Sequence, residues 1–440
     1  MKPQFLISSI GPGNGKTIFA MGLIHTLRKR GMKVQPYKCG PEITDTQLLT
    51  LSADNEAVNL DEWLTTYTHI QHTYNKYGEK ADACIIEGNG ALFDGYKRMQ
   101  GSSAEIAKLL NVPVVLLVNA RMAGYSIASI IYGFKHFHPQ VKIVGVVFNQ
   151  ITSSAHYSYL KEACFDAGVD CLGYLPYNAE FKLPSKHSSI TLTTKRTMDT
   201  QINLIADDIE KNININRLLM NCNRNFPCQY TLPYCSDIET ETVIPTSQQI
   251  KIAIARDPAF NFIYKENIAR LSIYGKITYF SPVYGSDLPE ADLIYLPGGY
   301  PELFARQLHR RHKLKNALKE YAEIGGKILA ECGGMAFLGR SITAKEGGTS
   351  YEMCNILPLD FTINSKLNSG YRKMTYNGVE LRGYEFHYSV TNNAENSLIA
   401  TQATNIKGTN VDLPLYRYKN IIASYGHWYW GDKDILDLWK

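Results

Sequence analysis

The sequence predicts an α/β protein of two domains, the first of them a doubly wound and mostly parallel sheet. Three observations predict it. The chain has 440 residues, which is too long for one typical hydrophobic core. Short apolar runs alternate with helical patterns over the first ~190 residues, as βαβ units require. A second alternating series begins near residue 250.

The first domain is predicted over residues 1–220. Its apolar runs PVVLLVNA and KIVGVVFN are continuous, which is typical of strands covered by helices on both faces. Helical patterns such as KTIFAMGLIHTLRKRG separate these runs, so the crossovers are expected to be right-handed and the sheet parallel.

A linker is predicted over residues 221–249, where Thr, Asn and Ser dominate. The apolar run KIAIARD then opens a second α/β domain over residues 250–440. ADLIYLPGG and GGKILAEC continue its alternating pattern, and its C-terminal half is richer in strand patterns.

Composition narrows the classes of function. Hydrophobic residues make up 45% and charged residues 20%, the balance of a globular protein. The net charge of +5 is small, and no Lys/Arg run alternates with aromatics, so no nucleic-acid partner is predicted. No segment approaches the ~20 apolar residues that span a bilayer, so we expect a cytoplasmic protein without a membrane partner. Nine scattered cysteines fit reduced thiols, and Cys222, Cys228 and Cys235 lack zinc-site spacing.

A phosphate-binding loop is predicted at SSIGPGNGKT, residues 8–17, between an apolar strand and an amphipathic helix. Glycines allow successive N–H groups to face phosphate oxygens, lysine adds positive charge, and the threonine hydroxyl can ligate Mg²⁺. The strict motif is not met, because its first glycine would fall on Ile10. The residues predicted to bind ATP here are Gly13, Asn14, Gly15, Lys16 and Thr17.

Acidic residues follow the next predicted strands. Glu42, Asp45 and Glu87 lie where strand ends should face the nucleotide cleft, and Lys38 lies beside them. Carboxylates and the Thr17 hydroxyl are the hard oxygen ligands that Mg²⁺ prefers. Each acid alone could equally be a solvated side chain. Asp94, in LFDG, is a candidate for substrate support or for a turn.

A nucleophile is predicted at Cys332. The run GKILAECGGMAFLG places this cysteine between an apolar strand and a helix, as in a nucleophile elbow. The helix N-terminus lowers a thiol pKa, and backbone N–H groups there can stabilise an oxyanion. A second glycine turn, LPGGYP at residues 296–301, could supply the other oxyanion donor.

Two histidines could serve as the base for this thiol. We favour His427 over His387, because His427 ends an apolar strand in the last α/β segment. Glu385 is a candidate to orient the base, although no His-x-Glu pair exists at His427.

These stretches together resemble the cobyrinic acid a,c-diamide synthase family, which joins a P-loop synthetase domain of dethiobiotin-synthetase type to a class I glutaminase domain. The resemblance runs nearly end to end. The matching stretches are VQPYKCGPE, NLDEW, IIEGNGALFDG, GSSAEIAKLL, GVVFNQ, LGYLP, LPSKH, IAIARDPAFNFIYKEN, LPGGYPELFA, AECGGMAFLG, RGYEFHYS and ASYGHWYW.

The resemblance implies an enzyme that uses ATP and glutamine to amidate the a and c carboxylates of a corrin-type macrocycle through an acyl phosphate. It implies that Asn149 lies where related synthetases read adenine, that Cys332 is the glutaminase nucleophile and that His427 activates it. It also implies that Mg²⁺ accompanies ATP, and it is compatible with a homodimer. Ser9 stands where the family usually has glycine, and Glu42 where it usually has aspartate.

Two alternatives stay open. A macrocycle amidase of the same architecture could act on hydrogenobyrinic acid or nickel-sirohydrochlorin. A P-loop regulatory protein with a ligand-binding, glutaminase-like module belongs to another class, and an intact Cys332 and His427 argue against it.

Overall fold

The computed structural model describes residues 1–440 except 122, 182, 184–191, 229–248, 346 and 393–395. The described chain clusters into two compact units, one made of residues up to 228 and one of residues from 249 onward. Most of the predicted linker, Cys235 and the LPSKH stretch after Leu183 lie outside the described residues, so the proposed domain bounds stay predictions. No described helix is long and apolar enough to cross a membrane.

The first unit is built on a sheet of the order β3-β2-β4-β1-β5-β6-β7, in which all these neighbours are parallel. The short strand β8 pairs antiparallel with β1. The predicted doubly wound, parallel sheet is therefore confirmed. The strands are β1 (Lys2–Ser9), β2 (Val34–Cys39), β3 (Val58–Leu60), β4 (Ala83–Glu87), β5 (Val114–Asn119), β6 (Ile143–Ile151), β7 (Cys171–Pro176) and β8 (Asn223–Arg224).

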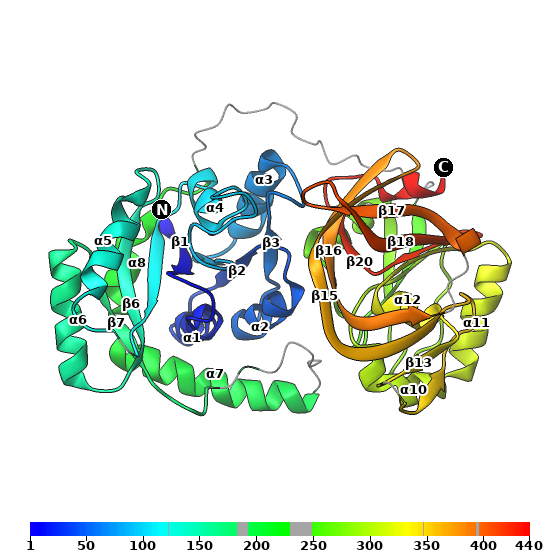
Figure 1. Ribbon diagram of the computed structural model, residues 1–440, viewed down its shortest axis with the longest axis horizontal. Coiled ribbons are helices and arrows are strands. Elements are labelled where there is room, and N and C mark those ends of the chain that lie inside the picture. The colour runs from blue at the N-terminus through cyan, green and yellow to red at the C-terminus, as the bar shows by residue number, and fades with distance from the viewer. Residues whose placement is uncertain (122, 182, 184–191, 229–248, 346, 393–395) are drawn as a thin grey trace. The chain divides into compact units, whose positions relative to one another are not determined.

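Helices cover both faces of this sheet. One face packs against α3, α4, α5 and α6 in a buried apolar cluster, and α1, α2 and α7 lie on the other face (Figure 1). Successive side chains of β1 point to opposite faces of the sheet, so Leu6 belongs to that cluster whereas Phe5 and Ile7 do not. Both faces of the strand are apolar and need a cover of helices. The helices are α1 (Lys16–Lys29), α2 (Ile43–Ala53), α3 (Tyr67–Gly78), α4 (Ser103–Leu109), α5 (Ile127–Phe137), α6 (Ser154–Asp166), α7 (Leu192–Asn212) and α8 (Ile215–Asn221).

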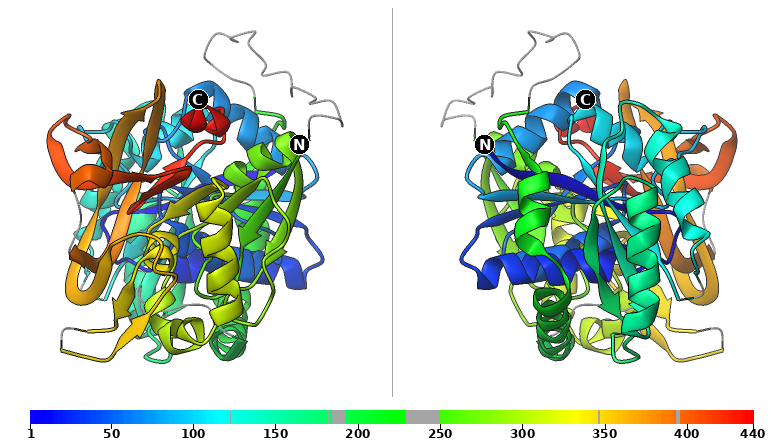
Figure 2. Two further views of the ribbon diagram at one scale, coloured as in Figure 1. Left: turned by 90° about the vertical axis from the view of Figure 1, so that its right-hand side faces the viewer. Right: turned by 90° about the vertical axis from the view of Figure 1, so that its left-hand side faces the viewer.

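The second unit begins with five parallel neighbours, in the order β10-β9-β11-β12-β19. Antiparallel strands extend this sheet, and β15 and β16 form its longest hairpin, seen as long curved strands in Figure 2. The strands are β9 (Ile250–Ala255), β10 (Gly275–Phe280), β11 (Leu293–Leu296), β12 (Lys327–Glu331), β13 (Ser341–Thr343), β14 (Ser350–Glu352), β15 (Asp360–Tyr376), β16 (Val379–Asn392), β17 (Ile399–Asn405), β18 (Asn410–Tyr418), β19 (Ile421–Ser424) and β20 (Gly426–Tyr429).

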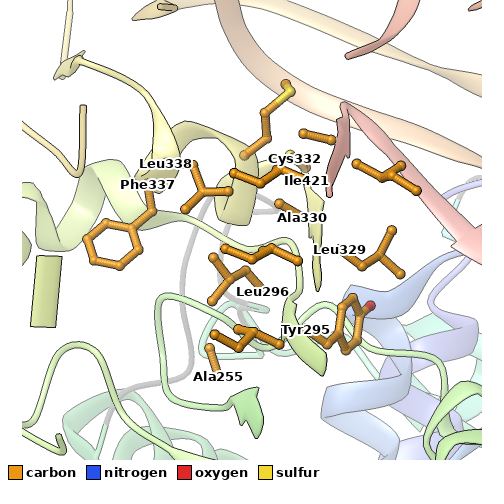
Figure 3. Packing of buried hydrophobic residues seen from close by; sticks show 14 of the residues in the cluster. Ala255, Tyr295, Leu296, Leu329, Ala330, Cys332, Phe337, Leu338 and Ile421 are labelled. Atoms are coloured by element: carbon orange, nitrogen blue, oxygen red, sulfur yellow. The ribbon is translucent and has the colours of Figure 1, made fainter. Parts of the chain in front are cut away.

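The predicted second α/β domain with a β-rich C-terminal half is confirmed by this sheet. Its core packs Leu296 of β11, Ala330 of β12 and Phe337 of α12 together, with Cys332 in the same cluster (Figure 3). Strand β12, which immediately precedes Cys332, is thus buried on both faces. The helices are α9 (Lys265–Tyr274), α10 (Ala305–His309), α11 (His312–Glu323), α12 (Gly333–Leu338), and the 3₁₀ turns η2 (Pro301–Phe304), η3 (Asn396–Leu398) and η4 (Ile435–Trp439).

Candidate active sites

The predicted phosphate loop connects β1 to α1. Gly13 and Gly15 have φ of 72° and 90°, and Gly15 is the N-cap of α1. A Cβ on Gly15 would lie 2.3 Å from the Asn149 amide nitrogen, so only glycine fits there. The loop therefore has the left-handed glycine backbone that turns N–H groups toward an anion at a helix N-terminus.

Lys16 is 8% exposed and is held by two neutral oxygens. Its Nζ donates to the Ser9 hydroxyl at 3.0 Å and to the Gly90 carbonyl at 2.6 Å. Burial, followed by the nearby Lys38 cation, lowers the pKa of Lys16. The serine that replaces the usual glycine at position 9 thus contacts the lysine directly, a role that the sequence did not reveal.

The acidic residues meet the loop at the ends of β2 and β4. Thr17 Oγ1 donates to Glu87 Oε1 at 2.6 Å, and the same carboxylate oxygen lies 3.2 Å from Lys38 Nζ. Lys38 Nζ also lies 2.7 Å from Asp45 Oδ2. Burial alone would lower the pKa of Lys38, but the carboxylates of Asp45, Glu87 and Glu42 outweigh it and raise that pKa. Four predicted residues, Thr17, Lys38, Asp45 and Glu87, are therefore brought together here.

Glu87 is 1% exposed, and burial raises its pKa to about 7 against the opposing effect of Lys38. Its second oxygen, Oε2, is buried without a hydrogen-bond partner in the described part of the chain. A buried carboxylate oxygen left unpaired beside a threonine hydroxyl suits a hard cation. Among the described residues no group of three or more His, Cys, Asp or Glu side chains forms a metal site, so such a cation would take its other ligands from phosphate and water.

The remaining predicted residues of this unit lie around the cluster. Glu42 is the N-cap of α2 and is half-buried. Asn149, at the end of β6, donates from its amide to the Asn14 carbonyl at 2.8 Å, so it contacts the phosphate loop in this structure. Asp94 is exposed in the loop after β4, where its N–H donates to the Ala91 carbonyl at 3.3 Å, which agrees with the turn alternative.

In the second unit, Cys332 stands at the turn from β12 to α12 with φ 44° and ψ −104°. Its N–H donates to the Ser424 carbonyl at 2.7 Å, which fixes the turn against β19. A Cβ on Gly334 would lie 2.0 Å from the Leu296 carbonyl, and one on Gly333 would lie 3.1 Å from the Gly299 nitrogen. The cysteine therefore has the strained strand-to-helix conformation of a nucleophile elbow, packed on the LPGGYP turn as predicted.

His427 lies beside this cysteine. A Cβ on Gly298 would lie 2.1 Å from His427 Cε1 and 3.3 Å from Cys332 Cβ, so the imidazole and the thiol residue flank the same glycine. His427 is 1% exposed, and the ring of Phe262 contacts it edge-on with centroids 5.3 Å apart. The structure therefore brings the predicted nucleophile and base together.

The protonation of this pair follows from its burial. Burial lowers the pKa of His427 to about 4, although the Phe386 carbonyl is close enough to favour the charged ring. Neither ring nitrogen has a hydrogen bond of normal geometry among the described residues. Burial, followed by the nearby Glu302 carboxylate, raises the pKa of the Cys332 thiol, and the Gly333 N–H acts against that rise. At rest the pair is a neutral thiol and a neutral imidazole whose lone pair is available.

His387 has a different environment, because both of its ring nitrogens are occupied. Nε2 lies 2.8 Å from Glu385 Oε1, Nδ1 lies 2.8 Å from the Ser389 carbonyl, and the ring stacks on Tyr425 at 3.7 Å. Glu385, named as a candidate to orient the base, therefore orients His387. The alternation of GYEFHYS along a strand could have placed these side chains on one face. Arg372, which pairs with Glu385, could not be found in this way because it lies on another strand.

A pocket opens on Cys332. The residues around it come from the LPGGYP turn, the elbow, β15 and β16. Its polar wall is formed by Glu302, His387, Tyr388 and Ser389. Sequence reasoning did not single out Glu302 or Ser389.

Family comparisons match both units separately. Residues 5–190 match the CobQ/CobB/MinD/ParA nucleotide binding domain, and residues 251–435 match the CobB/CobQ-like glutamine amidotransferase domain. A curated protein named cobyrinate a,c-diamide synthase from Dehalococcoides mccartyi is 35% identical and covers 98% of this chain and 95% of its own. The chain belongs to the cobyrinate a,c-diamide synthase family. It is accordingly a glutamine-dependent, amide-forming ligase with a nucleotide-binding domain.

Other members of the family are similarly close along the whole chain. The synthase of that name from Sulfurisphaera tokodaii is 33% identical and covers 97% of each chain. The one from Priestia megaterium is 32% identical and covers 97% of this chain and 94% of its own. Among solved structures, chloroplast FtsY from Physcomitrella patens covers 45% of this chain and 65% of its own at 13% identity, with a TM-score of 0.31 that is too low to carry an argument.

Proposed function

We propose that this member of the cobyrinate a,c-diamide synthase family amidates the a and c side-chain carboxylates of cobyrinic acid, with ATP as the activating agent and glutamine as the nitrogen source. One observation carries the proposal. Proteins of that name match nearly the whole chain, and the groups Lys16–Thr17–Glu87 and Cys332–His427 have a geometry that supports one half of the reaction each.

The first unit is proposed to activate the carboxylate. A carboxylate oxygen of the macrocycle attacks the γ-phosphorus of ATP, the bond from that phosphorus to the ADP oxygen breaks, and an acyl phosphate forms. Lys16, held by Ser9 and Gly90, would stabilise charge on the transferring phosphoryl group. Ammonia then attacks the acyl carbon, and phosphate leaves with one oxygen of the original carboxylate.

Mg²⁺ fits the same cluster. Thr17 Oγ1 and Glu87, with its unpaired Oε2, would hold the ion, and Asp45 lies on the far side of Lys38 as a further carboxylate. The ion supplies charge neutralisation at the phosphate oxygens when it is bound.

The second unit is proposed to release ammonia. The Cys332 sulfur attacks the carboxamide carbon of glutamine while His427 takes the thiol proton, and the neighbouring N–H groups of Gly299 and Gly333 would donate to the developing oxyanion. His427 returns the proton to the leaving nitrogen, so ammonia departs and a γ-glutamyl thioester remains. Water hydrolyses this thioester to glutamate and the free thiol.

A substrate panel tests the proposed specificity. Cobyrinate, hydrogenobyrinate and nickel-sirohydrochlorin are incubated with ATP, Mg²⁺ and glutamine, and the products are resolved by mass. We expect two successive amidations of cobyrinate. Amidation of another macrocycle at a higher kcat/KM would overturn the assigned substrate and leave the ligase chemistry intact.

Isotope transfer tests the acyl phosphate. With ¹⁸O in the macrocycle carboxylates, each amide formed should release one phosphate that carries ¹⁸O, since the departing phosphate takes a carboxylate oxygen. Unlabelled phosphate alongside normal amide formation would exclude this intermediate.

A further inference from the structure

A buried chain of charges lies on β15 and β16, and the glutaminase chemistry above does not use it. Arg372 Nε donates to Glu385 Oε2 at 2.6 Å, and Arg372 Nη2 lies 2.6 Å from the same oxygen. The other oxygen, Oε1, faces His387 Nε2 at 2.8 Å. The side chains of Arg372, Glu385 and His387 are 13%, 7% and 6% exposed, so this charge cluster is shielded from water.

The cluster places one carboxylate between two basic side chains. Burial would raise the pKa of Glu385, but the His387 hydrogen bond and the charges of His387 and Arg372 outweigh it and keep that pKa below its usual value. An ionised Glu385 can only accept hydrogen bonds, and so can the Ser389 carbonyl at Nδ1. Both ring nitrogens of His387 therefore face oxygen acceptors. The Arg372 guanidinium and the His387 ring thus share one carboxylate.

The cluster also touches both segments that carry the reacting side chains. Phe386 lies between Glu385 and His387 on β16, and its carbonyl oxygen is 3.9 Å from Cys332 Sγ. On the other side, His387 stacks on Tyr425, whose hydroxyl accepts from Ser389 Oγ at 3.0 Å. Tyr425 follows Ser424, which holds the Cys332 N–H, and precedes Gly426 and His427. Moving the cluster would therefore move the thiol and the imidazole.

We propose that Arg372, Glu385 and His387 form a positioning element of the glutaminase, which holds Cys332 and His427 in register and in which Arg372 and His387 offset the effect of the Glu385 carboxylate on the Cys332 thiol. The inference rests on the proposed role of Cys332 and His427, and it does not depend on which macrocycle is amidated. His387 is thereby a positioning residue, and His427 remains the base.

The other ionisable groups around the thiol predict the sign of the change in its pKa when a member of the cluster is removed. Glu302 on η2, Glu331 on β12 and Glu385 on β16 each raise the pKa of the Cys332 thiol, after the larger effect of burial. His387 opposes protonation of His427, and Glu385 favours it. Tyr425 and Tyr300, whose pKa values burial raises, stay neutral near pH 7. Removing Arg372 or His387 should thus disfavour the Cys332 thiolate, whereas removing Glu385 should not.

The test measures the rate of Cys332 alkylation by iodoacetamide against pH, with the modified peptide identified by mass. The variants are Arg372→Met, His387→Asn and the near-isosteric Glu385→Gln. The matched control is Lys373→Met, because Lys373 is the next residue on β15 and also pairs with β16, through Glu380 at 2.8 Å, but is 39% exposed. Arg372→Lys tests whether restoring the charge rescues the profile.

We expect the pH midpoint of alkylation to rise by at least ~0.5 unit in Arg372→Met and His387→Asn, to stay or fall in Glu385→Gln, and to stay in Lys373→Met. Arg372→Lys should return most of the shift. Glutaminase kcat should fall about tenfold or more in the first two variants, and ammonia-dependent amidation should not change. If all three cluster variants shift in the same direction, or if Arg372→Met matches Lys373→Met, the cluster is an ordinary structural feature and the proposal is wrong. If Arg372→Met fails to fold, His387→Asn and Glu385→Gln still test the proposal, because their expected shifts in the pH midpoint of alkylation differ in direction.

Discussion

At the scale of single residues, hydrogen bonding separates the two histidines near Cys332. His427 has both ring nitrogens without a hydrogen-bond partner among the described residues, whereas His387 is bonded at both nitrogens to oxygen acceptors. A base must offer a lone pair to the thiol proton. Only His427 does so in this structure, which supports the choice made from its place at a strand end.

Substitution of each histidine by asparagine tests this choice. We expect His427→Asn to lower glutaminase turnover by at least ~10²-fold, the lower end of the effect of losing a general base. His387→Asn should retain more activity, since it removes a side chain that contacts Glu385 and not the proton acceptor. Steady-state glutamate release gives both values. If His387→Asn abolishes Cys332 alkylation near neutral pH while His427→Asn leaves it intact, the roles are reversed.

The pH dependence of the glutaminase should show the burial of His427. Its pKa of about 4, against an ordinary value of ~6.5, leaves the imidazole neutral and able to accept a proton at any pH above about 4. The acid limb of kcat/KM for glutamine should therefore lie well below pH 6.5. The same shift costs stability, because the unfolded chain binds a proton below ~6.5 that the folded site refuses until about pH 4. An acid limb of kcat/KM at pH ~6.5, measured where the fold is intact, would contradict the buried environment of His427.

At the scale of elements, glycine turns set the distances within the glutaminase site. The end of β11 and the turn after it approach the elbow so closely that side chains cannot fit, and Gly298 is the clearest case. Its missing Cβ leaves room for the His427 ring on one side and Cys332 on the other.

Gly298→Ala should therefore damage the glutaminase and spare the synthetase. An added Cβ would lie 2.1 Å from His427 Cε1, so the ring or the turn must shift, and misplacement of about 1 Å can cost ~10²-fold. Glutamate release with glutamine, compared with amidation from added ammonia, measures the two halves. Gly133→Ala is the control, since a Cβ there meets nothing within 4 Å. Normal glutamate release in Gly298→Ala would show that the turn adapts freely.

The elements that the sequence revealed are those with strong local patterns. The parallel strands are continuous apolar runs, and both catalytic turns carry glycines between a strand and a helix, so β1–α1 and β12–α12 could be predicted. The Lys16–Ser9 bond, the Arg372–Glu385 pair and the Phe386 carbonyl beside Cys332 could not. Each joins residues through the register of strands or loops, which no local pattern encodes.

At the scale of the whole molecule, one chain carries the two predicted reaction sites in two compact units. The phosphate loop, Glu87 and Lys38 belong to the first unit, and the elbow, His427 and the charge cluster belong to the second. Each unit has its own buried apolar core, so a substitution in one need not unfold the other. Loss of function can therefore be assigned to one half of the reaction at a time.

Reciprocal substitutions test this division of labour. Cys332→Ala should abolish amidation from glutamine and leave amidation from added ammonia, because the thiol acts only in releasing nitrogen. Lys16→Ala should abolish amidation from either source, because its charge acts on the phosphoryl group, while basal glutamate release persists. Amide formation and glutamate release are measured for each variant, with circular dichroism to establish folding. Loss of both activities in a folded Cys332→Ala, or ammonia-dependent amidation that survives in Lys16→Ala, would show that the two sites do not divide the reaction in this way.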